Sequence, residues 1–83
     1  MNWNVYIVRC SDGSLYTGIT TDLTRRVSEH NNKTGAKALK GKLPVKIVYS
    51  EFFPDRSSAS MRESEIKQLS RKEKLELINV AVN

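Results

Sequence analysis

A short apolar run near the start of the chain constrains the fold more than any other feature of the sequence. Val5-Tyr6-Ile7-Val8 is β-branched and aromatic, and it lies within a strand predicted over residues 3–10. In a strand, Val5 and Ile7 point to one side while Tyr6 and Val8 point to the other. Both sides are therefore apolar, which predicts a strand in the centre of a sheet rather than at its edge.

The next segment predicts a hairpin. Asp12-Gly13 is a turn signal, and residues 15–19 return as a second strand. A two-residue turn would place Tyr6 and Tyr16 on opposite faces of the sheet. The two tyrosines share a face only if the loop has an odd number of residues or the strands contain a bulge.

Capping and periodicity signals predict the remaining elements. A helix capped within residues 20–22 runs to about residue 30, and a basic loop over 31–44 contains a short helical turn at 36–40. A third strand covers 45–53, with Val45, Ile47 and Tyr49 on one face. A helix capped by Asp55 or by Ser57-Ser58 runs to about Leu69, and the box Ser70 to Glu73 starts a last helix that ends near Val80.

The order strand, strand, helix, strand, helix, helix predicts an α+β fold, a small three-stranded antiparallel sheet flanked by three helices. The 83 residues fit one domain, 1–83. Cys10 is the only cysteine and can form no intrachain disulfide. No apolar run approaches the roughly 20 residues of a membrane span, and the N-terminus does not resemble a signal peptide. We therefore expect a cytoplasmic protein that has no contact with membranes.

The positive charge of the chain favours a polyanionic partner. The formal net charge is +5 and the isoelectric point is about 9.6. Lysines that contact phosphates release condensed counterions, which favours nucleic-acid binding. Lysines of the basic loop are candidates for this contact, although a solvated surface explains them equally well. These candidates are Lys33, Lys37, Lys40 and Lys42.

Two polar residues lie on the apolar side of the first predicted helix. Leu23, Val27 and His30 recur at helical spacing, and Arg26 belongs to the same face, whereas Arg25 points to solvent. A buried histidine with a hydrogen-bond partner is the simpler interpretation of His30. For Arg26 we favour a functional role, because guanidinium is a planar donor suited to phosphate oxygens.

The second long helix has a carboxylate at the flank of its packed stripe. Glu63 lies one turn after Ala59 and three residues before Ile66. Such a carboxylate suits a hard divalent cation. The alternative is a capping box over residues 60–63, which the earlier caps at 55–58 oppose because they leave Glu63 inside the helix.

Tyr6 and Tyr16 lie on neighbouring strands, where tyrosines usually serve packing. Gly18 removes a side chain from the face of Tyr16 and leaves space for another group to approach the backbone.

Together, these residues resemble the motifs of the GIY-YIG endonuclease family. Val5-Tyr6-Ile7 and Tyr16-Thr17-Gly18 are similar to the pair of motifs that names the family. The stretch 22–27 resembles its first helix, with Arg26 at the place of its essential arginine. The stretch 63–67 resembles the later helix that carries a metal-binding glutamate. The match covers most of the chain and is closest to the small stand-alone bacterial branch. Asn4 stands where the first motif has its glycine.

The resemblance implies hydrolysis of phosphodiester bonds with one divalent metal, Mg²⁺ or else Mn²⁺, held by Glu63. Arg26 would offset charge in the transition state. Tyr16 would act as the general base and Tyr6 would orient the water, with His30 in reserve as base or phosphate contact. We expect DNA rather than RNA as the substrate, and a protein partner for targeting.

Two other function classes remain open from the sequence. One is a nucleic-acid-binding module that keeps the fold with weak or no catalysis, and the other is a protein–protein adaptor without nucleic acid. Metal-dependent cleavage of nucleic acid would distinguish a nuclease from the binding module. Salt-sensitive binding of nucleic acid would distinguish both of these from the adaptor, because binding to phosphates weakens steeply with salt.

Overall fold

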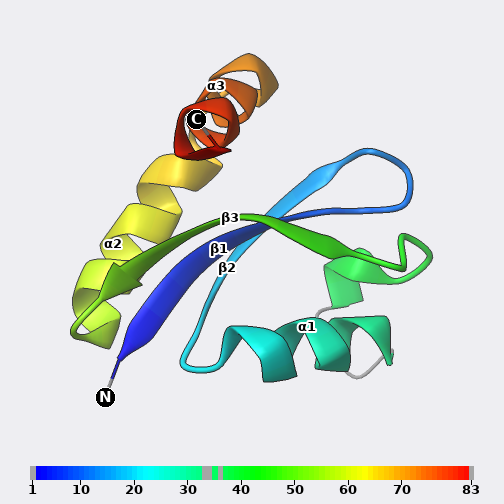
Figure 1. The fold of residues 1–83 in the computed structure, drawn as a ribbon, viewed down its shortest axis with the longest axis horizontal. Helices are drawn as coiled ribbons and strands as arrows, with labels where there is room; N and C mark the ends of the chain where they lie inside the picture. Colours follow the sequence, from blue (N-terminus) through cyan, green and yellow to red (C-terminus); the bar gives the residue numbers. More distant parts are fainter. Residues whose placement is uncertain (1, 33–34, 36, 83) are drawn as a thin grey trace.

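The computed structural model describes residues 2–32, 35 and 37–82. Its helices and strands follow the predicted order, and the α+β fold class is confirmed (Figure 1). Among the described residues, no helix is long and apolar enough to cross a membrane. The elements are β1 (Trp3–Arg9), β2 (Leu15–Thr20), α1 (Leu23–Asn31), the short 3₁₀ helix η1 (Lys37–Leu39), β3 (Lys46–Phe53), α2 (Arg56–Lys67) and α3 (Arg71–Val82).

The three strands form one antiparallel sheet in the order β2-β1-β3. The apolar strand β1 is central, as its sequence predicts. Helix α1 lies on one side of the sheet and α2 on the other (Figure 1). Because helices cover both faces of the sheet, the side chains of β1 that point to either face are buried.

Each face of the sheet has its own hydrophobic cluster. On the α2 side, Val5 and Ile7 of β1 pack with residues of α2 and α3. On the α1 side, Tyr6 and Val8 pack with residues of α1 and of the segment before β3. The buried members of the first cluster are Val5, Ile7, Ala59, Ile66 and Ile78, and those of the second are Tyr6, Val8, Cys10, Leu39 and Val45.

The register of the β1–β2 hairpin places both motif tyrosines on the α1 side. Val8 pairs with Tyr16, and Tyr6 pairs with Gly18. Residues 10–14 form a loop of odd length, so the two-residue turn is wrong and the odd-loop alternative is correct. Tyr6, Tyr16 and Gly18 therefore share one face.

The predicted alternation along the third strand fails at a bulge. Ile7 pairs with Tyr49 but Val8 pairs with Ile47, which leaves Val48 as an extra residue. The bulge changes the parity of the strand, so Ile47 packs on the α1 side while Tyr49 packs on the α2 side. The sequence places Ile47 and Tyr49 on one face, and this prediction is wrong.

The helix caps decide one question left open by the sequence. The side chain of Asp55 accepts a hydrogen bond from the Ser58 backbone at 2.7 Å, so α2 begins before residue 57 and Glu63 lies inside it. The capping-box alternative over residues 60–63 is therefore wrong. The box between Ser70 and Glu73 is confirmed by reciprocal bonds of 2.9 and 3.2 Å. Helix α2 ends at Lys67, before Leu69, and α3 continues past Val80.

Candidate active site

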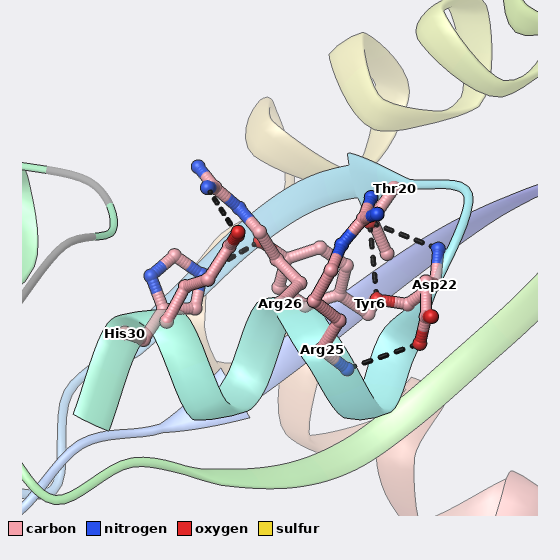
Figure 2. A network of polar contacts seen from close by, with 7 residues as sticks. Tyr6, Thr20, Asp22, Arg25, Arg26 and His30 are labelled. Carbon is pink, nitrogen blue, oxygen red and sulfur yellow. Dashed lines mark hydrogen bonds and ion pairs between the residues drawn. The ribbon is translucent and has the colours of Figure 1, made fainter. Parts of the chain in front are cut away.

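Four of the five residues singled out for catalysis meet on the α1 side of the sheet. Tyr6 comes from β1, Tyr16 from β2, and Arg26 and His30 from consecutive turns of α1. The Tyr6 hydroxyl lies 2.9 Å from Nε2 of His30 (Figure 2). Both side chains are 1% exposed. A contact between residues so far apart in sequence depends on packing of α1 against the hairpin.

Arg26 borders this buried pair. Its guanidinium donates a hydrogen bond to Glu29 at 3.1 Å and lies close enough to the Tyr6 hydroxyl to lower the pKa of that group. About a third of its side chain, 33%, remains exposed. The neighbouring Arg25 is exposed, as helical spacing predicts. Arg26 thus has one end in contact with the buried tyrosine and part of its surface open to an anion.

Burial and charge keep the Tyr6–His30 pair neutral. Burial raises the pKa of Tyr6, and the hydrogen bond from Arg26 offsets this only in part. Burial, together with the positive charge of Arg26, lowers the pKa of His30. At neutral pH, Tyr6 therefore keeps its proton and shares a hydrogen bond with Nε2 of the uncharged His30.

Tyr16 lies beside the pair and keeps part of its surface exposed. Its ring meets that of His30 edge-on, with the centroids 5.8 Å apart. Its electrostatic influence contributes to the raised pKa of Tyr6. The two motif tyrosines consequently differ in access, since Tyr6 is enclosed and Tyr16 reaches the surface.

Two glycines allow these side chains to pack as they do. A Cβ at Gly18 would lie 2.6 Å from the Tyr6 hydroxyl oxygen, so the space predicted there is occupied by Tyr6 itself. A Cβ at Gly35 would lie 2.2 Å from Nδ1 of His30. The sequence does not predict this role of Gly35, because its only local signal is a glycine in the loop after α1.

Glu63, the fifth predicted catalytic residue, lies on α2, on the opposite side of the sheet from α1. Helix α2 packs on β1 and β2, and the Glu63 carboxylate pairs with Lys67 at 3.4 Å while remaining 22% exposed. Its negative charge contributes to the raised pKa of Tyr6, so it acts electrostatically on the cluster. Its neighbour Arg62 donates two bonds of 3.0 and 3.2 Å to Glu51 of β3, which holds α2 in register with the sheet.

The described carboxylates and histidine do not form a metal site with three or more protein ligands of these types. In the part of the chain that the structure describes, no three His, Cys, Asp or Glu residues are grouped to hold a metal ion. A protein cage is therefore excluded there. A single partly exposed carboxylate such as Glu63 fits a hard cation like Mg²⁺, which keeps most of its water ligands.

The lysines predicted to bind nucleic acid do not share one place. Lys37 and Lys40 line a cavity beside His30. Lys42 does not line it and instead lies by the hairpin loop, where its carbonyl accepts from Ser11 at 2.9 Å. Lys33 lies outside the described residues.

Asn31, the last residue of α1, has a structural role that the sequence analysis also missed. Its side-chain amide accepts from the Val45 backbone at 2.7 Å and donates to the Val45 carbonyl at 3.2 Å. These two bonds join the end of α1 to the start of β3 and close the intervening loop.

Comparison with known proteins adds independent information. Residues 2–76 match the family model described as GIY-YIG catalytic domain. A UPF0213 protein of Clostridium perfringens is 52% identical over 79 residues, which cover 95% of this chain and 84% of that protein. A UPF0213 protein of Haloquadratum walsbyi is 56% identical over 73 residues, with 88% and 82% covered.

Solved structures agree with the fold. The solution structure of a UPF0213 protein of Bacillus halodurans is 44% identical, with a TM-score of 0.63. A protein of E. faecalis, also solved in solution, is 38% identical with a TM-score of 0.65. Each comparison covers 96% of this chain and 85% of the other.

Proposed function

We infer a nuclease function from one premise, that this chain belongs to the GIY-YIG family. The catalytic-domain match supports a nuclease-type domain with a nucleic-acid substrate. We propose that residues 1–83 act as a single domain that hydrolyses phosphodiester bonds in DNA. The observation that carries the proposal is the cluster of Tyr6, Arg26 and His30, with Tyr16 on the same face.

Arg26 is the proposed stabiliser of the transition state. Negative charge builds on the phosphoryl oxygens as water attacks, and a preorganised guanidinium at that place lowers the barrier. The bond of Arg26 to Glu29 supports this role because it holds the guanidinium in place, next to Tyr6, before the substrate arrives. Its exposed part remains available to phosphate oxygens.

Tyr16 is the proposed general base. It is the motif tyrosine with access to the surface, whereas the enclosed Tyr6 keeps its proton because burial raises its pKa. A tyrosine acts as a base near neutral pH only beside positive charge, and in this proposal Arg26 and the bound metal together would supply it. Tyr6 and His30 then position Arg26 and the ring of Tyr16, and His30 is the reserve proton acceptor.

Glu63 is the proposed holder of a divalent cation, Mg²⁺ in the first place. Such a cation supplies Lewis-acid stabilisation of the phosphate and of the leaving oxygen. The Glu63 side chain is 22% exposed and its partner Lys67 is 54% exposed, which supports a partly accessible carboxylate in an ion pair that is readily exchanged. The lone Cys10, which can form no intrachain disulfide, supports a cytoplasmic location as part of the proposal.

A cleavage assay with matched variants tests the proposal. Labelled branched and nicked DNA is incubated with the protein and Mg²⁺, and cleavage rates are compared. Arg26→Ala is expected to lower the rate by about 10²- to 10³-fold. Arg25→Ala, its exposed neighbour on α1, serves as the control and should keep most of the activity. Glu63→Ala should abolish the response to Mg²⁺, and Glu65→Ala on the same helix should not.

Two outcomes would replace the proposal by another function. Salt-sensitive DNA binding without cleavage at any Mg²⁺ or Mn²⁺ concentration would make the protein a binding module. No DNA binding at low salt would favour a protein–protein adaptor. Cleavage that survives Glu63→Ala unchanged would overturn the assignment of the metal ligand.

A further inference from the structure

A cavity of about 640 Å³ lies beside the candidate active site. It shares one wall, the imidazole of His30, with the cluster around Tyr6. Its volume falls within the range of about 300–1,000 Å³ that small-molecule pockets usually have. We call it the lysine cavity, and among the described residues it is lined by His30, Gly35, Lys37, Leu39, Lys40, Gly41 and Leu43.

The local structure places both lysines of the cavity on one side. Lys37 and Lys40 are three residues apart, and the Lys40 backbone donates to the Lys37 carbonyl at 3.1 Å. A 3₁₀ helix has about three residues per turn, so residues at this spacing lie above one another. Leu39 points into the protein instead and is 2% exposed. The short helix and the turn residue that follows it thus present two ammonium groups, while Leu39 anchors the segment in the core.

The backbone around the lysine cavity is held at both ends. Asn31 fixes the start of the loop to Val45 through two hydrogen bonds. On the other side, the Lys42 backbone donates to the Leu39 carbonyl at 3.0 Å, and Gly41 adopts a positive φ of 80° that suits glycine. These contacts hold in place the segment that carries the two lysines.

The chemistry of the lining selects an anion that also has an apolar part. Two lysines contribute positive charge, and the described lining residues include no carboxylate that would oppose an anion. Leu43 is partly exposed and offers apolar surface, and Gly41, whose missing Cβ would meet no atom, leaves the backbone accessible. A nucleotide combines these properties, since its phosphate suits the ammonium groups and its base suits apolar surface.

We propose that the lysine cavity receives one nucleotide of the bound strand, with its phosphate at Lys37 and Lys40 and its base against Leu43. The proposal rests on the proposed nuclease function and adds which part of the substrate is held beside the catalytic cluster. Because His30 separates the cavity from Tyr6, the strand would pass from the lysine cavity to Arg26 and Tyr16.

The single histidine of the chain provides a specific probe of this cavity. The imidazole signals of His30 are followed by NMR while the protein is titrated with deoxyadenosine monophosphate. We expect saturable shifts at His30 and at the Gly41 amide. Deoxyadenosine and inorganic phosphate, tested separately, should each bind at least about tenfold more weakly, because each satisfies only half of the cavity.

Variants separate this site from general attraction of anions. Lys37→Ala combined with Lys40→Ala should weaken nucleotide binding at least about tenfold. Lys72→Ala removes an exposed lysine from α3 and should leave it unchanged. Nucleotide binding that survives the double variant, or that leaves the His30 signals unmoved, would overturn the proposal. Inorganic phosphate that binds as tightly as the nucleotide would also overturn it, since the cavity would then be an anion site only.

This titration requires neither metal nor cleavage, so its result is independent of the catalytic proposal. Nucleotide binding in the lysine cavity by a protein that cuts no DNA would support the cavity and refute the nuclease. Cleavage that is lost in Arg26→Ala, without nucleotide binding in the cavity, would support the nuclease and refute the cavity.

Discussion

Replacing Gly18 by alanine is expected to destabilise the fold, because the new methyl group would meet the ring of Tyr6. The added Cβ would lie 2.6 Å from the Tyr6 hydroxyl oxygen, 2.8 Å from Cζ and 3.1 Å from Cε1. Carbon atoms pack at about 3.5–4.0 Å, so all three contacts are too close. Tyr6 has little room to retreat, since it is 1% exposed and bound to His30.

The size of the effect follows from two opposing terms. Overpacking a rigid core costs about 1–3 kcal/mol. Replacing glycine within a strand recovers about 0.5–1 kcal/mol of backbone entropy. The expected net loss is therefore about 0.5–2 kcal/mol, and a loss of 1 kcal/mol lowers the melting temperature of a domain of this size by about 4–8 °C.

A double-mutant cycle, read by urea denaturation, isolates the contact. Tyr6→Leu removes all three ring atoms that the methyl group would meet, so Gly18→Ala should cost little in that background. Tyr6→Phe removes only the hydroxyl and should relieve part of the cost. The reasoning is refuted if Gly18→Ala is neutral in the natural protein, or if its cost is the same in the Tyr6→Leu background.

Three further predictions concern stability. The free energy of unfolding should fall as the pH drops below about 6.5. The reason is that His30 of the unfolded chain binds a proton there, whereas burial lowers the pKa of the imidazole in the folded protein. The slope is at most about 1.4 kcal/mol per pH unit, and His30→Gln should abolish it. Asn31→Ala should cost about 1–3 kcal/mol in a urea titration by removing both bonds to Val45, and an effect no larger than that of Arg25→Ala would contradict this role. Arg62→Ala should cost about 0.5–1 kcal/mol by thermal melting through loss of its paired bonds to Glu51, and an effect no larger than that of Arg25→Ala would contradict this account.

The elements of this protein are encoded locally. The apolar run of β1, the Asp22 and Asp55 caps and the Ser70–Glu73 box each act within a few residues, so the sequence predicts the order of strands and helices and the central place of β1. Helical spacing also places Arg26 and His30 on the inner side of α1. These properties follow from short-range periodicity and hydrogen bonding, which require no knowledge of the rest of the chain.

Other properties were decided only by tertiary packing. Side chains along a strand alternate with a period of two, so one residue in the length of the hairpin loop determines whether Tyr6 and Tyr16 share a face. The bulge at Val48 likewise reverses the face of Tyr49, and nothing in the local alternation of β3 indicates it. Both registers depend on which arrangement best buries the two faces of the sheet.

The candidate site shows the same division most clearly. The sequence identifies Tyr6, Arg26 and His30 as unusual, but their mutual contacts join segments that are distant in the chain. Gly18 and Gly35 acquire their importance from atoms of Tyr6 and His30 that come from other elements. Local sequence thus determined which groups are present, and the packing of α1 on the hairpin decided which of them touch, because that contact depends on burial of the whole sheet face.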